Sequence, residues 1–199
     1  STPINVNCFE MENFTPSVSD NCVHVTFRVT AEHTTTNTPG CPLGPNVLKR
    51  IVRTYVATDG SGNESLPCQV TINVIRIANP AMITKPADRT IAGSNAIQCD
   101  APYAKIPAGQ PFAGNPSPVA IGDNFGTGVP MINGTPLYPD PNLHCNITVS
   151  FTDVKLPEIN CVTKIIRTWS VIEWSCDNRV IPPLAPQMIE IVDNQGPQV

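Results

Sequence analysis

One string of residues occurs twice in this chain and constrains its fold more than any other feature. Residues 50–63 begin Arg-Ile-Val-Arg-Thr-Tyr and end Asp-Gly-Ser-Gly-Asn. Residues 164–178 begin Lys-Ile-Ile-Arg-Thr-Trp and end Ser-Cys-Asp-Asn. Each copy is a β-branched run that leads into a polar turn, which is the pattern of one strand and its turn. A chain that repeats such a unit is built from modules, so we expect two modules of similar architecture.

The composition favours an all-β fold. The 199 residues are consistent with two domains, and a hydrophobic content of 41% suits two small cores. Charged residues make up only 14%, and 22 residues are proline. No stretch carries a sustained apolar stripe at helical spacing, so strands joined by turns and loops are predicted throughout.

Charge and hydropathy exclude several classes of function. A net charge of −4 and a pI near 5.3 argue against nucleic acid or an anionic membrane surface as partner. No apolar run reaches the length of a transmembrane helix, so direct membrane insertion is not expected. The sequence shows no signal-peptide pattern. We expect the chain to be a processed or excised piece of a longer protein.

The first module is predicted to span residues 1–83 and to contain five strands. In the third of them Val23, Val25, Phe27 and Val29 share one face, which is expected to be buried. A turn rich in glycine follows the fourth strand. The five predicted strands are 3–8, 16–20, 23–29, 47–58 and 69–77.

The second module is predicted to span residues 84–199 and to repeat this order. It differs by two inserted loops, 100–115 and 125–144, which are rich in glycine and proline and should lie on the surface. Residues 193–197 resemble a further linker, as if a third module followed. The predicted strands are 86–91, 118–124, 147–151, 162–172 and 187–192.

The eight cysteines divide equally between the two modules, which suggests structural disulfides and an oxidising compartment. Zinc is the alternative, but no pair has C-x-x-C spacing. If five strands alternate in direction, the first strand ends beside the start of the fourth, and the third and fifth start together. A bond from Cys161 to Cys176 would span about 30 Å along one strand, beyond disulfide reach. The predicted pairs are Cys8–Cys41, Cys22–Cys68, Cys99–Cys161 and Cys145–Cys176.

The same residues carry a family resemblance. Asp-Asn-Cys at residues 20–22, Ile-x-Arg-Thr-Tyr at 51–55 and Thr-Asp-Gly-Ser-Gly-Asn at 58–63 resemble the HYR and HYR-like domains. Arg-Thr-Trp-x-Val-x-Glu-Trp-x-Cys at 167–176 is similar to tandem HYR-like repeats in very large surface proteins of Bacteroidota. Such proteins are often exported by the type IX secretion system, and some serve gliding motility or adhesion. The resemblance implies two disulfide-stapled, immunoglobulin-like β-sandwich modules at the cell surface, and it identifies no ligand.

Few residues suggest chemistry, and we expect no enzyme activity and no cofactor. Asp20, Asp59 and Asp123 could offer oxygens to calcium, but Asp and Asn are also the ordinary residues of turns. Gly60-Ser61-Gly62 is read as a hairpin turn rather than as a nucleophile elbow. Arg53 and Arg167 recur at one strand position. They either pair with an acid or cover apolar surface with their stems. Trp169 is predicted in the core at the place of Tyr55, and Trp174 at the turn.

Two functions remain open. The first is a non-catalytic stalk or spacer in an adhesin or surface filament, whose partners are neighbouring repeats of the same polypeptide. The second is an adhesion module whose inserted loops contact a surface glycan or an outer-membrane protein. An accessory domain of a secreted enzyme is a further alternative. Five apolar residues of the inserted region discriminate between the first two, since packing against their own module favours the spacer and an exposed patch favours binding. They are Phe112, Phe125, Met131, Leu137 and Tyr138.

Overall fold

The computed structural model describes residues 2–8, 17, 25–77, 79–139, 145–177 and 179–193. In these residues the chain is nearly all β, with one short 3-10 helix, η2 (Pro80–Met82), so the predicted all-β class is confirmed. None of the described segments is a helix long and apolar enough to cross a bilayer.

The chain folds into two compact units that interleave along the sequence. Unit 1 takes the described parts of Ser1–Asn79, Asn142–Asn146 and Glu173–Arg179. Unit 2 takes the described parts of Pro80–Pro141, Ile147–Ile172 and Val180–Val199. The units divide near the predicted boundary at residue 83, but two short segments of the second module fold with unit 1.

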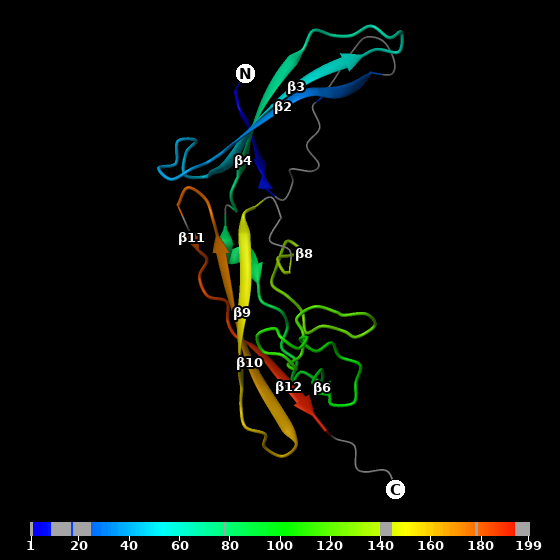
Figure 1. The fold of residues 1–199 in the computed structure, drawn as a ribbon, viewed down its shortest axis with the longest axis vertical. Coiled ribbons are helices and arrows are strands. Elements are labelled where there is room, and N and C mark those ends of the chain that lie inside the picture. Colours follow the sequence, from blue (N-terminus) through cyan, green and yellow to red (C-terminus); the bar gives the residue numbers. More distant parts are fainter. Residues whose placement is uncertain are drawn as a thin grey trace. The chain divides into compact units, whose positions relative to one another are not determined.

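Unit 1 holds one four-stranded sheet, ordered β1 (Ile4–Asn7), β4 (Cys68–Ile75), β3 (Val47–Thr58) and β2 (Thr26–Thr36) (Figure 1). Strands β2, β3 and β4 are antiparallel neighbours, whereas β1 runs parallel to β4. The β-branched run of residues 47–58 forms the central strand, as predicted, since such side chains pack well on a pleated surface. Its buried side chains include Leu48, Ile51 and Tyr55.

The neighbouring strand β2 departs from the prediction. Every residue of β2 is exposed, including Phe27 at 40% and Val29 at 48%, so these two do not form a buried face. Phe27 does contact the edge of the Tyr55 ring, with centroids 5.9 Å apart. Residue Val23 and nearly all of the predicted strand 16–20 lie outside the described residues.

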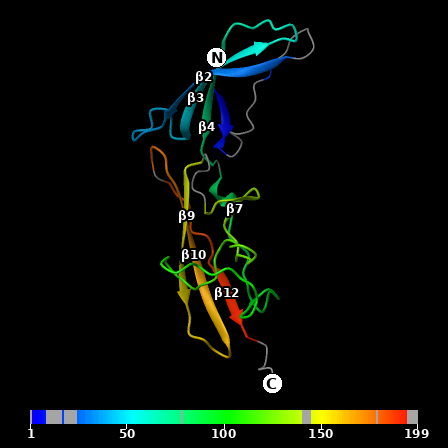
Figure 2. The same cartoon turned by 45° about the vertical axis from the view of Figure 1, so that its right-hand side comes forward.

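Unit 2 is built on a larger sheet, in which the central strand β10 (Val162–Glu173) pairs with β12 (Gln187–Val192) on one side and β9 (Ile147–Lys155) on the other (Figure 2). Strand β6 (Ile97–Gln98) joins the far edge of β12, and β11 (Arg179–Val180) pairs with β10. Ile97, Ile165 and Ile189 form its core. A small separate sheet contains β5 (Ile83–Thr84), β7 (Met131–Ile132) and β8 (Thr135–Pro136).

The two main sheets share one plan, which is the structural counterpart of the sequence repeat. In each, a short early strand runs parallel to the last strand, which is antiparallel to the central strand. The plan is less regular in the second copy. Residues 86–91 join β12 through the single bridge Arg89–Ile189 before the chain returns as β6. The predicted strand 118–124 is wrong, because Ile121 and Asn124 close a tight turn there.

Candidate functional site

An arginine at the same place in each central strand pairs with a carboxylate of the neighbouring strand. Arg53 Nε donates to Glu32 Oε2 at 2.6 Å, with side chains 21% and 42% exposed. Arg167 Nε donates to Asp153 Oδ1 at 2.7 Å, and both of these side chains are fully buried. Of the two roles that the sequence left open for these arginines, ion pairing is therefore confirmed.

The inserted region, residues 100–144 with its two loops, completes the surroundings of Arg167. Its Nη2 donates to Asp153 Oδ2 at 2.8 Å and to the carbonyl of Pro116 at 2.7 Å, while Nη1 donates to Thr127 Oγ1 at 2.9 Å. The guanidinium carbon lies 4.4 Å from the ring centroid of Phe151. A buried charge is tolerated only when paired and hydrogen-bonded, so the loops that carry Pro116 and Thr127 are structural parts of unit 2.

Aromatic side chains extend this cluster into the inserted loops. Tyr138 meets Trp169 and Phe151 edge-on, with centroids 5.9 and 6.0 Å apart, and Phe112 lies 5.8 Å from Phe151. Trp169 is 1% exposed, as predicted for the counterpart of Tyr55, and Leu137 is 2% exposed. Three of the five discriminating residues (Phe112, Leu137 and Tyr138) thus pack on their own unit. The remaining two, Phe125 and Met131, are 38% and 39% exposed.

An apolar cleft of about 490 Å³ opens beside these rings. The rings of Phe112, Tyr138 and Phe151 line it, together with prolines of the inserted region and the polar side chains of Gln110 and Ser117. Its volume falls in the range of small-molecule sites, and stacking on aromatic faces is what it offers a ligand.

The two described disulfides lie in unit 1 and differ from the predicted pairing. Cys8 bonds to Cys145 and Cys41 to Cys176, with Cα atoms 4.9 and 5.0 Å apart. The bonded partners are separated by 137 and 135 residues, so each bond joins the first sequence repeat to the second. Disulfide bonding is confirmed, but the pairs Cys8–Cys41 and Cys145–Cys176 are wrong.

The other two predicted pairs are also absent. Cys99 and Cys161 are exposed free thiols, so the predicted bond between them is wrong. Cys68 is an exposed free thiol too, so the predicted Cys22–Cys68 bond is not formed, and Cys22 itself lies outside the described residues. The strand count placed Cys8 at the correct edge, beside the start of β3, because β1 ends level with Ile75 and Val47. The predicted pairs are wrong because the strand count considered partners only within one module.

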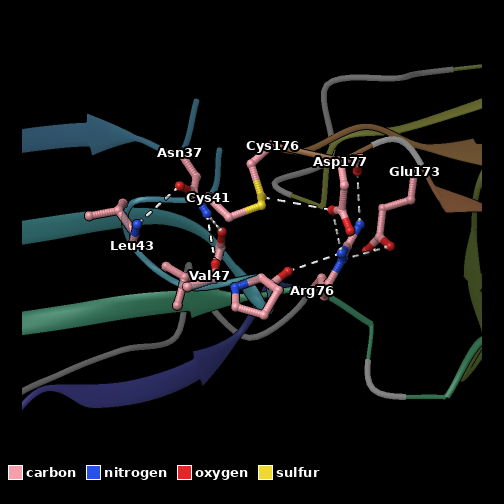
Figure 3. The surroundings of a disulfide bond; sticks show 10 residues. Asn37, Cys41, Leu43, Val47, Arg76, Glu173, Cys176 and Asp177 are labelled. Carbon is pink, nitrogen blue, oxygen red and sulfur yellow. Dashed lines mark hydrogen bonds and ion pairs between the residues drawn. A yellow bond between two sulfur atoms is a disulfide. The ribbon is translucent and has the colours of Figure 1, made fainter. Parts of the chain in front are cut away.

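A cluster of ion pairs surrounds the Cys41–Cys176 bond (Figure 3). Arg76 donates from Nε to Glu173 Oε2 at 3.1 Å and from Nη1 to Asp177 Oδ1 at 2.8 Å. Arg179 Nη2 reaches the same Glu173 oxygen at 2.6 Å, and the Ile77 amide donates to its other oxygen at 3.2 Å. Glu173 is fully buried, so this carboxylate holds the segment after β10 against the end of β4.

The loop that carries Cys41 is shaped by one buried amide. Asn37 Nδ2 donates to the carbonyls of Gly44 and Val47 at 2.8 and 2.7 Å, and Asn37 Oδ1 accepts the Leu43 amide at 3.2 Å (Figure 3). These three bonds tie both ends of the loop together. They therefore fix where the Cys41 sulfur lies.

The calcium candidates that the structure describes, Asp59 and Asp123, belong to different units. Asp59 accepts the Ser61 and Asn63 amides and the Asn63 side chain at 2.8–2.9 Å. The side-chain and backbone bonds from Asn63 lower the pKa of Asp59, as expected for a turn that closes on its own carboxylate. Asp123 lies in a separate turn of unit 2, and Asp20 is outside the described residues.

Among the described residues, the one group of His, Cys, Asp and Glu close enough to hold a metal is Cys41, Cys176 and Asp177. Both of its sulfurs are consumed by the disulfide, so it lacks thiolate ligands. The Gly60-Ser61-Gly62 segment forms the predicted turn, with the Gly62 amide bonded to the Asp59 carbonyl. Trp174, predicted at the turn, follows β10 and is 55% exposed.

Sequence reasoning missed Asp153, Asn37 and Glu173, which organise these clusters. A polar residue inside a strand, such as Asp153 in β9, was the available signal, since an acid at such a position needs a basic partner. Comparison with protein-family models, with curated proteins and with solved structures finds no match to this chain.

Proposed function

We propose that this chain is a structural stalk or spacer segment of an extracellular cell-surface protein, built from two HYR-like repeats of immunoglobulin type. The observation that carries the proposal is the pattern of disulfides. Each bond connects residues more than a hundred positions apart and joins one sequence repeat to the other. Disulfides persist in oxidising, extracellular surroundings, so this pattern supports a location at the cell surface.

The topology of the sheets supports the immunoglobulin-type assignment. In each repeat the last strand pairs with the central strand, which pairs with an earlier strand, as in the CFG sheet of such a sandwich. A short first strand adds a parallel edge to this order. Both repeats have this order, and they differ in the loops that connect the strands. Tandem repetition of one unit suits a protein whose role is length and stiffness.

The disulfides also define how a stalk would carry load. A force applied to the two ends passes from Cys8 directly to Cys145, or from Cys41 to Cys176, and bypasses the chain between Cys41 and Cys145. About 60 residues then remain in the extensible path, which is roughly 220 Å, against about 700 Å for the reduced chain. The bonds therefore limit extension even when the sheets unfold.

Single-molecule pulling on the 199-residue chain, attached at both ends, tests this proposal. We expect full unfolding under oxidising conditions to stop near the shorter length, and addition of reductant to release the longer one. Equal unfolded lengths with and without reductant would show that the disulfides do not limit extension and would contradict the load-bearing role.

The apolar cleft of unit 2 supports a second candidate function, an adhesion module that binds a ligand with its inserted loops. The half-buried rings that line it would stack on the apolar face of a sugar or a flat organic group. A glycan array probed with the wild-type chain and with Phe112→Ala tests it. Binding that the substitution abolishes supports adhesion, whereas no binding by the wild type leaves the spacer as the function.

A further inference from the structure

Two of the described free cysteines, Cys99 and Cys161, stand at the positions where the first repeat forms its disulfides. Cys8 directly follows Asn7, the last residue of β1 to pair with β4. Cys99 directly follows Gln98, the last residue of β6 to pair with β12. Both short strands run parallel to the last strand of their repeat, so Cys99 is the structural counterpart of Cys8.

Cys41 and Cys161 correspond in the same way. Each lies in the turn that precedes the central strand of its repeat, six residues before β3 in one case and one residue before β10 in the other. Both have a left-handed backbone, with φ of 54° and 60°, which non-glycine residues adopt rarely. Cys99 and Cys161 flank the same strand end, because the Cys99 amide bonds to the Val192 carbonyl and the Asp193 amide to the Cys161 carbonyl.

The cysteines that accept the bonds from Cys8 and Cys41 are called receiving cysteines below, and they lie next to β9 and β10. Cys145 lies just before β9, and Cys176 lies just after the central strand β10. In the first repeat, Cys22 precedes β2 in the sequence, and Cys68 begins the strand that follows β3. In the first repeat Cys8 and Cys41 bond to cysteines further along the chain, and in the second repeat Cys145 and Cys176 accept those bonds. Cys99 and Cys161 take the positions of Cys8 and Cys41 but are free thiols. In the sequence, Cys22 and Cys68 flank β2 and β3 as Cys145 and Cys176 flank β9 and β10.

We propose that Cys99 and Cys161 form two disulfides with the receiving cysteines of a further repeat of this kind. This inference rests on the proposed function as an array of repeats. Each bond forms when two thiols lose two protons and two electrons to a disulfide oxidant, which leaves as two thiols. A junction in which one end of a repeat binds the opposite end of the next extends as a filament unless its rotation closes a ring.

The charge at this end influences which repeat fits. Asn7 pairs with Ile75, which precedes Arg76, and Gln98 pairs with Val192, which precedes Asp193. Asp193 therefore stands at the position of Arg76, so its negative charge would face the group that a receiving repeat carries where Glu173 stands. The first repeat of this chain has Asp59 at that position, so a second copy is a usable probe only at high salt, which screens the repulsion.

The test uses the chain with its two disulfides intact, concentrated at high salt and treated with oxidised glutathione. Loss of hydration and the charges of Asp193 and Asp100 raise the pKa of Cys99, so the reaction is run at about pH 8.5. We expect a ladder of multimers on a non-reducing gel. Peptide mapping should show Cys99 or Cys161 of one copy joined to Cys22 or Cys68 of another.

Two double variants give the matched control. Cys99→Ser/Cys161→Ser and Cys22→Ser/Cys68→Ser should each stay monomeric, and an equimolar mixture should form dimers and nothing larger. The melting temperature of the Cys99→Ser/Cys161→Ser variant should be that of the wild type, because both thiols are exposed. An internal Cys99–Cys161 bond, bonds between identical cysteines, or glutathione adducts alone would overturn the proposal. The pulling experiment on a single chain is independent of this result, so the two proposals fail separately.

Discussion

Arg167 and Asp153 form a fully buried ion pair at the position where the first repeat has the partly exposed pair Arg53–Glu32. The same arginine–carboxylate pair therefore occurs in both repeats, with different exposure to solvent. The inserted region of the second repeat makes the difference, because it supplies Pro116 and Thr127 to the guanidinium. Comparing the pairs measures what burial does to one ion pair within a single chain.

We expect Asp153→Ala to destabilise unit 2 by about 3–5 kcal/mol, because it leaves the Arg167 charge buried without a counter-ion. Glu32→Ala in the partly exposed pair should cost about 1 kcal/mol or less. Urea unfolding followed by tryptophan fluorescence, to which the buried Trp169 contributes, reports the first, and circular dichroism reports the second. Equal losses for both variants would mean that the buried charge gains little from Asp153.

The disulfide pairing predicts which peptides stay linked without reductant and how much a bond contributes to the free energy of unfolding. Peptide mapping without reductant should recover Cys8 linked to Cys145 and Cys41 linked to Cys176, and no link from Cys8 to Cys41. Replacing Cys8 and Cys145 together by serine should lower the free energy of unfolding by about 3–5 kcal/mol, since the bond closes a loop of more than a hundred residues. Calorimetry measures the change, with the exposed Cys68→Ser as a neutral control.

Asn37 is expected to control the Cys41 loop. Asn37→Asp removes the two donors to Gly44 and Val47 while keeping the size of the side chain, so we expect a loss of about 2–3 kcal/mol. Oxidative refolding should also form the Cys41–Cys176 bond more slowly, which quenched peptide maps measure. The exposed Asn133→Asp serves as control, and an unchanged rate with Asn37→Asp would show that the loop is shaped without this amide.

Glu190 contributes to stability in a pH-dependent way. Lys164 Nζ lies 2.8 Å from its Oε1, and the Ile91 amide donates to Oε2 at 2.8 Å. These interactions lower the pKa of Glu190 from its ordinary value of 4.5. A carboxyl whose pKa is lower in the folded state binds protons more weakly there, so its contribution is present above pH 4.5 and fades as the pH falls through the lowered value.

Glu190→Gln should therefore reduce the stability near neutral pH and flatten the acid side of the pH–stability curve. Urea unfolding at several pH values between about 3 and 6 measures the slope. Glu64→Gln, in the exposed Arg28–Glu64 pair, should change the stability near neutral pH by about 1 kcal/mol or less. An acid limb as steep in Glu190→Gln as in the wild type would assign that slope to other carboxyls.

Much of the fold was accessible from the residues alone. The repeated string predicted β3 and β10, and with them the buried places of Tyr55 and Trp169, because β-branched runs bounded by polar turns read locally as strands. Alternation failed for β2, where Phe27 and Val29 are exposed, because period-two spacing identifies a face but not what covers it. Residues 118–124 copied the order of the first repeat yet form a turn.

By itself the sequence determined the class, the repeat, the central strands and the edge of the sheet at which Cys8 and Cys41 lie. These follow from local backbone preference and from strand direction. Tertiary structure alone decided that Cys145 and Cys176 bond with the first repeat, and that Arg167 is fully buried where Arg53 is partly exposed. The reason is physical. A disulfide and a buried ion pair depend on which distant segments pack together, and spacing along the chain carries no record of that choice.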